Sequence, residues 1–143
     1  MKLNTGKIAF SIEFDNGNKT NIYFNPNDPD LFIRIKNFEG LVSKRIKAFD
    51  DVELSSDGTP TNAEKIEVFE QMQDIIKEEL DRAFGGEISD EIFKYCSPFA
   101  VVDDEYFIIQ FIKAITPEIK KHMEKASAES RERMAKHIGK YSK

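Results

Sequence analysis

The sequence has little cysteine, no tryptophan and no long apolar run. Because Cys96 is the only cysteine, an internal disulfide is excluded, and a reducing compartment is the natural setting. The first residues contain no apolar segment of the kind found in signal peptides, and no run approaches the roughly 18 apolar residues that a membrane span needs. We therefore expect a cytoplasmic protein with no membrane partner.

Motifs of the common enzyme classes are also missing. No glycine belongs to a GxGxxG or GxxxxGK[ST] pattern, and no serine lies in a GxSxG elbow. His122 and His137 lie 15 residues apart, and no short spacing brings Cys96 to them, so we interpret them as surface histidines and a core thiol. The loop between Asp50 and Asp57 is acidic but lacks the spacing of a calcium loop. We expect no metal, no cofactor and no enzyme.

One acidic cluster leaves an alternative open. Asp103, Asp104 and Glu105 could serve as a general base or hold a divalent cation. Acidic side chains also gather at helix N-termini, where they meet exposed N–H groups and the positive end of the helix dipole. We interpret the cluster as the cap of the following helix. A buried pocket with converging polar groups there would instead favour a small-ligand or metal-dependent enzyme.

What is present indicates one folded domain. The chain of 143 residues is 40% hydrophobic and 33% charged, and it contains 12 phenylalanines. This length and composition are typical of a single domain with a real core. We expect an α+β, mostly α fold in which an N-terminal hairpin precedes four to five helices, the last of them long and basic.

The hairpin is predicted from alternating apolar residues up to Phe14 and again from Lys19 to Phe24. A two-residue loop would set apolar residues opposite polar ones. A three-residue loop over Asn16 to Asn18, with Gly17 or Asn18 left-handed, sets Ile12 opposite Ile22 and Phe10 opposite Phe24. We therefore predict the three-residue loop.

Helices are predicted from their caps and apolar stripes. The first runs from Pro29 to about Phe49 and is capped by Asp28, and its stripe is Leu31, Ile35, Phe38, Val42, Ile46 and Phe49. The second runs from Ala63 to Phe84, is capped by Thr61 or Asn62 and ended by Gly85-Gly86, and its stripe is Ile66, Phe69, Met72, Ile76, Leu80 and Ala83. A short helix capped by Ser89 follows and is terminated by Ser97-Pro98.

The apolar stretch from Tyr106 to Ile115 fits either a central helix or a strand, and the acidic residues before it favour the helix. Thr116-Pro117 is then expected to start the last helix, since proline is favoured at the first helical position. The resulting organisation is a compact body over residues 1–116 and a projecting amphipathic helix over residues 117–143.

Charge separates these two regions. From Pro117 onward there are eight lysines and arginines against four glutamates, a net charge of +4. Because the whole chain has a net charge of −5, the residues before Pro117 have a net charge of −9. The glutamates interleave with the basic residues at spacings that favour pairs within the helix, and no aromatic residue lies between Pro117 and Lys140. Nucleic acid is therefore not expected as a partner.

Three stretches together resemble a known family. They are LNTGKIAFSIEFDNG followed by IYFNPNDPDLFIRI, the central EELDRAFGGEISDEIFKYCSPFAVVDDEYFIIQFIKAITPEI, and the charged Ala/Ser-rich tail. In word order they resemble the tail assembly chaperones of long-tailed phages and prophages of Gram-positive bacteria. The resemblance spans nearly the whole chain and contains no catalytic motif.

The resemblance implies a protein of the bacterial host cytoplasm that binds the tape-measure protein and keeps it soluble until tail-tube subunits polymerise around it. Self-association and contact with the tail-tube protein are further expectations. We expect the last helix to contact the partner through Ile119, Met123, Ala126, Met134 and Ile138, with the neighbouring Lys120 and Arg131. The alternative is a structural virion component, such as a head–tail joining or tail-completion protein.

Overall fold

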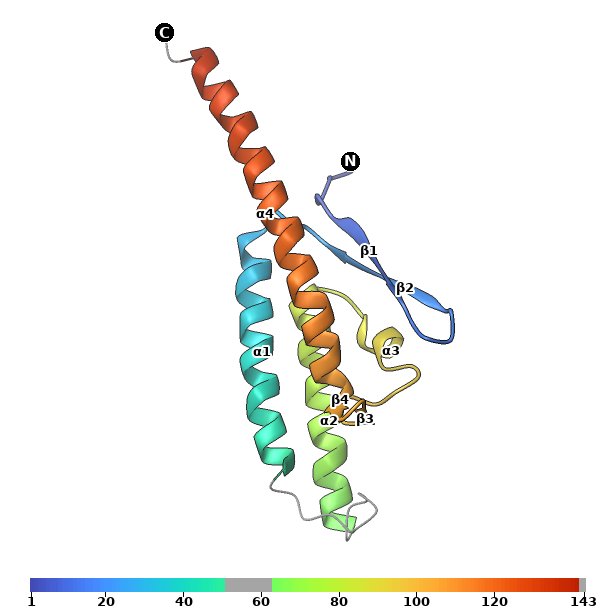
Figure 1. Ribbon diagram of the computed structural model, residues 1–143. Helices are drawn as coiled ribbons and strands as arrows, with labels where there is room; N and C mark the ends of the chain where they lie inside the picture. Colours follow the sequence, from blue (N-terminus) through green and yellow to red (C-terminus); the bar gives the residue numbers. More distant parts are fainter. Residues whose placement is uncertain (51–62, 142–143) are drawn as a thin grey trace.

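The computed structural model describes residues 1–50 and 63–141. Its elements are β1 (Ile8–Glu13), β2 (Lys19–Phe24), α1 (Pro29–Asp50), α2 (Ala63–Phe84), α3 (Ser89–Ile92), β3 (Val101–Val102), β4 (Glu105–Tyr106) and α4 (Phe107–Tyr141). Helices α1 and α2 lie antiparallel, α4 crosses in front of them, and the β1–β2 hairpin lies on the other side of α4 from α1 (Figure 1). The predicted α+β, mostly α class is confirmed, with four helices among the described residues.

The turn of the hairpin has the predicted length but not the predicted position. Its loop comprises residues 15–17 rather than 16–18, because the Phe14 N–H donates to the Asn18 carbonyl at 2.8 Å. Gly17 has a φ of +85°, the left-handed conformation that a three-residue loop requires at its last position. The prediction of a left-handed Gly17 is therefore confirmed.

This displacement changes the strand register by two residues. Ile8 lies opposite Phe24 and Phe10 opposite Ile22, so the expected pairs of Ile12 with Ile22 and Phe10 with Phe24 are wrong. Because a shift of two residues preserves the alternation of side chains, the apolar residues still share one face. That face packs against the core, in which Ile22 and Phe24 are buried.

Helix α1 begins where its cap predicts. Asp28 Oδ1 accepts a hydrogen bond from the Asp30 N–H at 3.0 Å, which satisfies one of the open donors of the first turn. Ile46 of the predicted stripe is only half-buried, whereas the other five are buried: Leu31, Ile35, Phe38, Val42 and Phe49. The stripe therefore forms one wall of the core.

Helix α2 has the predicted bounds and ends in a Schellman motif. Gly85 is left-handed with a φ of +67°, and the Gly86 N–H donates to the Asp81 carbonyl at 3.1 Å. Its stripe is buried from Met72 onward, but Ile66 is 44% exposed, which corrects the prediction for the first turn. The caps expected at residues 61–62 lie outside the described residues.

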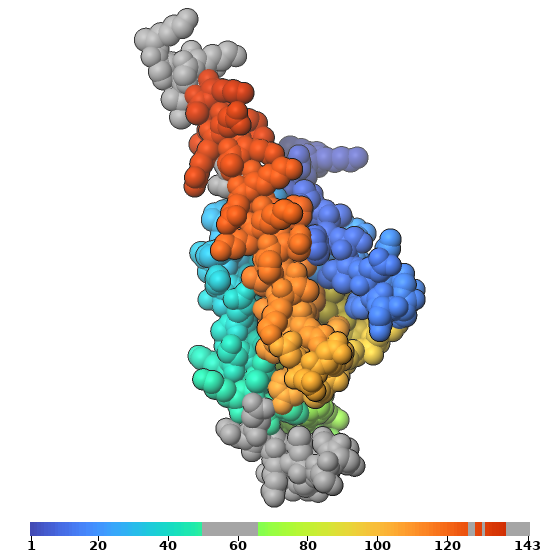
Figure 2. Space-filling view, in the orientation of Figure 1, coloured from blue at the N-terminus to red at the C-terminus, as the bar shows by residue number. Residues whose placement is uncertain are grey.

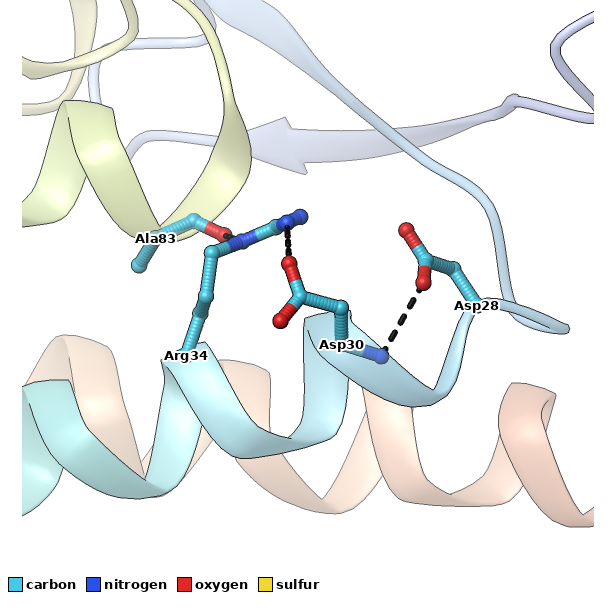
Figure 3. A network of polar contacts seen from close by, with 4 residues as sticks. All are labelled: Asp28, Asp30, Arg34 and Ala83. Carbon is cyan, nitrogen blue, oxygen red and sulfur yellow. Dashed lines mark hydrogen bonds and ion pairs between the residues drawn. The ribbon is translucent and has the colours of Figure 1, made fainter.

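A polar contact ties the start of α1 to the end of α2. Arg34 Nε donates to the Ala83 carbonyl at 3.0 Å, and the same guanidinium pairs with Asp30 one turn earlier (Figure 3). Because the last carbonyls of a helix lack partners within the helix, this contact satisfies a group that α2 cannot satisfy itself. The first turns of α1 are thereby fixed against the body.

Ser89 does not cap α3 as predicted. Ile88 occupies the N-cap position, and its side chain makes no capping hydrogen bond. Instead, Asp81 of α2 accepts hydrogen bonds from the Ile88 N–H at 2.8 Å, the Ser89 N–H at 2.7 Å and the Ser89 hydroxyl at 2.8 Å. A carboxylate from a neighbouring helix therefore replaces the local cap, which sequence spacing alone could not indicate.

The acidic cluster is a turn rather than a helix cap. Asp103 and Asp104 have φ values of 51° and 65° and join β3 to β4 in a tight hairpin. Aspartate tolerates this left-handed conformation better than most residues, which explains the pair at these positions. Glu105 is in β4 and pairs with Lys113, so no acidic residue lies in the first turn of α4.

Helix α4 is continuous from Phe107 to Tyr141, which corrects the expected break at Thr116-Pro117. The helix predicted for the apolar stretch is confirmed from Phe107 onward. Pro117 lies inside α4 and is exposed. Thr116 Oγ1 donates a hydrogen bond of 3.1 Å to Glu39 Oε1 of α1 instead of capping a helix. One buried stripe crosses the proline: Ile108, Phe111, Ile115 and Ile119. Packing of this stripe holds α4 together where local preference would end it.

Candidate functional site

A groove follows the seam between α1 and α4. At its middle it is lined by Phe32, Ile35, Lys36, Thr116, Ile119, Lys120 and Met123. Toward the C-terminal end of α1 it continues between Val42 and Ile112, where the Thr116–Glu39 hydrogen bond crosses from one helix to the other. We call this feature the α1–α4 groove.

The α1–α4 groove widens where α1 begins. Its wide end has a volume of about 770 Å³ and is lined by Pro26, Asn27, Asp28, Pro29, Phe32, Lys120, Met123, Glu124, Ala128, Arg131 and Met134. The groove opens there because α1 starts at Pro29, while α4 continues beyond it. In Figure 2 the surface of α4 extends past that of α1. We call residues 120–141 the distal segment of α4.

Burial falls steadily along the α4 wall of the groove. Ile119 is 2% exposed and belongs to the core, Met123 is half-buried, and Met134 is 62% exposed. On the opposite wall Phe32 is 46% exposed. Phe32 and Met134 thus present large apolar surfaces to solvent at the wide end, which resembles a docking surface more than a closed pocket.

Charged side chains of both signs line the wide end. Lys120 and Arg131 are exposed, and neither forms an ion pair with the side chains that the structure describes. Asp28 is engaged in capping α1, whereas Glu124, also exposed, has no such ion pair within the described residues. Deeper in the groove, Lys36 lies 5.6 Å above the Phe32 ring and 3.6 Å from Glu39. The unpaired charges are therefore concentrated on the distal segment.

The predicted contact residues meet at this groove in part. Lys120, Met123, Arg131 and Met134 line the wide end, and Ile119 contributes the floor from the core. The side chains of Ala126 and Ile138 lie outside the described part of the chain, so their predicted roles stay predictions.

The α1 wall of the groove was not predicted from the sequence. Phe32 was not assigned a role, although a signal for it exists. It is a large apolar residue that falls between Leu31 and Ile35 of the buried stripe and so points away from the core.

The other candidate residues do not assemble into a chemical site. His122 packs edge-on against Phe10 and Phe24, each at a ring-centroid distance of 6.1 Å. Burial raises the pKa of the Cys96 thiol above its ordinary value, which disfavours the nucleophilic thiolate. Asp103 and Asp104 are exposed at their turn. Across residues 1–50 and 63–141, no cluster of three or more His, Cys, Asp or Glu side chains is arranged to hold a metal ion.

Comparison with protein-family models, curated proteins and solved structures finds no match. Within the described helices, none is both long enough and apolar enough to cross a bilayer. The acidic loop between Asp50 and Asn62 lies outside the described residues, apart from the backbone of Asp50. The α1–α4 groove is the candidate functional site.

Proposed function

We propose that this protein is a phage tail assembly chaperone that holds helical segments of the tape-measure protein in the α1–α4 groove. The single observation that carries the binding role is the open groove in which Phe32 of α1 faces Met123 and Met134 of α4. An amphipathic helix laid between two helices buries its apolar stripe against such side chains. The family resemblance supplies the identity of the partner and the location in the bacterial host cytoplasm.

The side chains of the groove suit a helical partner that has many similar apolar stripes along its length. Methionine is flexible and polarizable, so Met123 and Met134 can pack against apolar side chains of different shape. Burying one such side chain contributes about 1.5–3 kcal/mol before the cost of ordering is subtracted. One groove therefore supports weak binding, and several copies along a long helical partner keep it soluble while each can still dissociate.

The partner's charge pattern follows from the rim of the groove. Lys120 and Arg131 are exposed cations that flank the apolar wall. Rim charges mainly steer encounter and fix orientation rather than supply affinity. We therefore expect tape-measure segments with acidic residues beside their apolar stripe to bind faster at low salt.

Co-expression of this chain with the tape-measure protein from the same genome tests the proposal. We expect a larger soluble fraction of tape-measure protein and co-purification of the two chains. Absence of both effects with the wild-type chain would overturn the proposed function. The chain's absence from finished particles would distinguish a chaperone from the alternative, a structural virion component.

Adjacent residues on α1 offer a matched pair of variants for the same experiment. Phe32 is 46% exposed and lines the groove, whereas Ile33 is 54% exposed and does not line it. We expect Phe32→Glu to abolish co-purification and Ile33→Glu to preserve it, with both variants folded by circular dichroism. Equal binding by the two variants would show that the partner does not use the groove.

A further inference from the structure

The distal segment of α4 carries a self-complementary pattern on its groove-facing side. Glu124 and Arg131 are seven residues apart, which places them on one side of the helix about two turns, or roughly 10 Å, from each other. Both line the wide end of the groove, between Met123 on one side and Met134 on the other. Two charges of opposite sign thus lie between two exposed or half-exposed methionines.

These charges are available to a second molecule. Glu124 and Arg131 are both exposed, and within the described part of the chain neither forms an ion pair. By contrast, Lys136 and Glu132 on another side of the same helix lie 3.9 Å apart and pair within the helix. Glu124 and Arg131 therefore face the groove without an ion pair, while Glu132 and Lys136 pair on another side of the helix.

The orientation of a second copy follows from the order of the two charges. If two α4 helices run parallel in register, Glu124 meets Glu124 and Arg131 meets Arg131, and like charges repel. If they run antiparallel about a two-fold axis near residue 128, each Glu124 lies beside Arg131 of the other copy. Glu124 and Arg131 are seven residues apart and so occupy the same heptad position, beside the line along which the two helices meet. Charge therefore selects the antiparallel arrangement.

The same axis brings the apolar residues together. It places Met123 of each copy beside Met134 of the other, because both pairs are nearly symmetric about residue 128. It also lays each distal segment along the α1–α4 groove of the other copy, next to Phe32. The segment beginning at Pro117 has a net charge of +4, and the residues before it, which it then approaches in the other copy, have −9.

We propose that a second copy of this chain occupies the wide end of the α1–α4 groove, forming an antiparallel two-fold dimer through the distal segments of α4. Each interface contains two Glu124–Arg131 ion pairs and two Met123–Met134 contacts. Such an isologous interface closes on itself and does not propagate into filaments. The dimer goes beyond the proposed function, since it requires no tape-measure protein, and it covers the groove until a partner displaces it.

Sedimentation of the full chain alone tests the dimer. We expect wild-type protein to sediment as a dimer at about 100 µM, a concentration at which even a weak specific interface is populated. Glu124→Arg and Arg131→Glu each convert both ion pairs to like-charge pairs, and each is expected to raise the dissociation constant about tenfold or more. Glu129→Arg and Lys125→Glu make the same changes of charge on other sides of α4 and are expected to leave the dimer intact.

A mixing experiment tests the register. The Glu124→Arg and Arg131→Glu proteins are each expected to pair with themselves more weakly than the wild type, but an equimolar mixture restores both ion pairs in a heterodimer. We expect native mass spectrometry to detect that heterodimer, and the double variant Glu124→Arg/Arg131→Glu to dimerise again. A monomeric wild-type chain, unchanged association in the single variants, or no recovery on mixing would overturn the proposal.

The two proposals fail separately. A wild-type chain that stays monomeric and still co-purifies with tape-measure protein overturns the dimer and leaves the chaperone role intact. A wild-type dimer that gains no tape-measure protein overturns the proposed function alone.

Discussion

The two halves of α4 belong to one helix but have opposite surroundings. Residues 107–119 supply four buried side chains to the core, whereas Met134 in the distal segment is 62% exposed. Local sequence does not separate them, because the helix is continuous across Pro117. The difference arises from the other elements: α1 begins at Pro29 and offers no wall beyond that point. One helix can therefore serve as core and as docking surface according to what lies beside it.

Truncation is expected to give the largest difference in unfolding free energy between the two halves of α4. A chain ending at Thr116 loses Ile119, which is 2% exposed, and we expect it to lose at least about 3 kcal/mol of unfolding free energy. A chain ending at Glu124 keeps that side chain and is expected to lose less than about 1 kcal/mol while losing self-association. Urea unfolding and sedimentation measure the two. Equal loss of stability would show that the boundary between the halves lies elsewhere.

Single substitutions sharpen the same contrast. Ile108 is fully buried, and Ile108→Ala is expected to cost about 2–5 kcal/mol of unfolding free energy through the cavity it leaves. Met134→Ala removes a side chain of similar size from a position that is exposed in the single chain, and in dilute, monomeric protein it is expected to change stability by no more than about 0.5 kcal/mol. Denaturant unfolding of both variants checks the pair. A comparable cost at Met134 would place the distal segment in a packed environment.

The junction between the halves should respond in the opposite direction. Pro117 is exposed and lacks the N–H that an interior helical residue donates, so Pro117→Ala is expected to raise the unfolding free energy by about 1–2 kcal/mol. Part of the gain is offset because alanine makes the unfolded chain more flexible. Thermal unfolding measures the change, and a lower melting temperature would indicate that the proline shapes α4 in a way that packing requires.

The smallest expected effect concerns the bond that crosses the groove. Thr116→Val removes the hydroxyl that contacts Glu39 at 3.1 Å but keeps the branched shape, and we expect a loss of about 0.5–1.5 kcal/mol. The distal segment should be unaffected, so dimerisation at a given concentration is expected to remain unchanged. Unfolding and sedimentation of the same sample check both. A loss of dimerisation would show that the halves are coupled.

Local chemistry predicted most of the fold. Asp28, Pro29 and the glycines after Phe84 mark helix ends correctly because their preferences act within a few residues. The errors lie where a distant partner decides the outcome. Asp81 caps α3 from another helix, and the buried stripe carries α4 through a proline that locally indicates a start.

The candidate site was also predicted only in part from the sequence. The α4 wall was predicted from its apolar stripe and basic neighbours, and five of those residues line the groove. The α1 wall was not predicted, because the place of Phe32 between Leu31 and Ile35 indicates that its side chain is exposed but not that α4 lies beside it. The depth and width of the groove depend on where α1 begins relative to α4, a relation between elements far apart in the sequence.

The position of α4 in the chain has a consequence for how the protein is made. The hairpin leaves the ribosome before α4, yet Phe10 and Phe24 pack against His122, about a hundred residues later. Contacts between such distant segments slow folding, since a long loop must close before they contribute. The apolar surfaces of the hairpin, α1 and α2 that α4 covers in the folded protein therefore remain exposed during synthesis until α4 has been made.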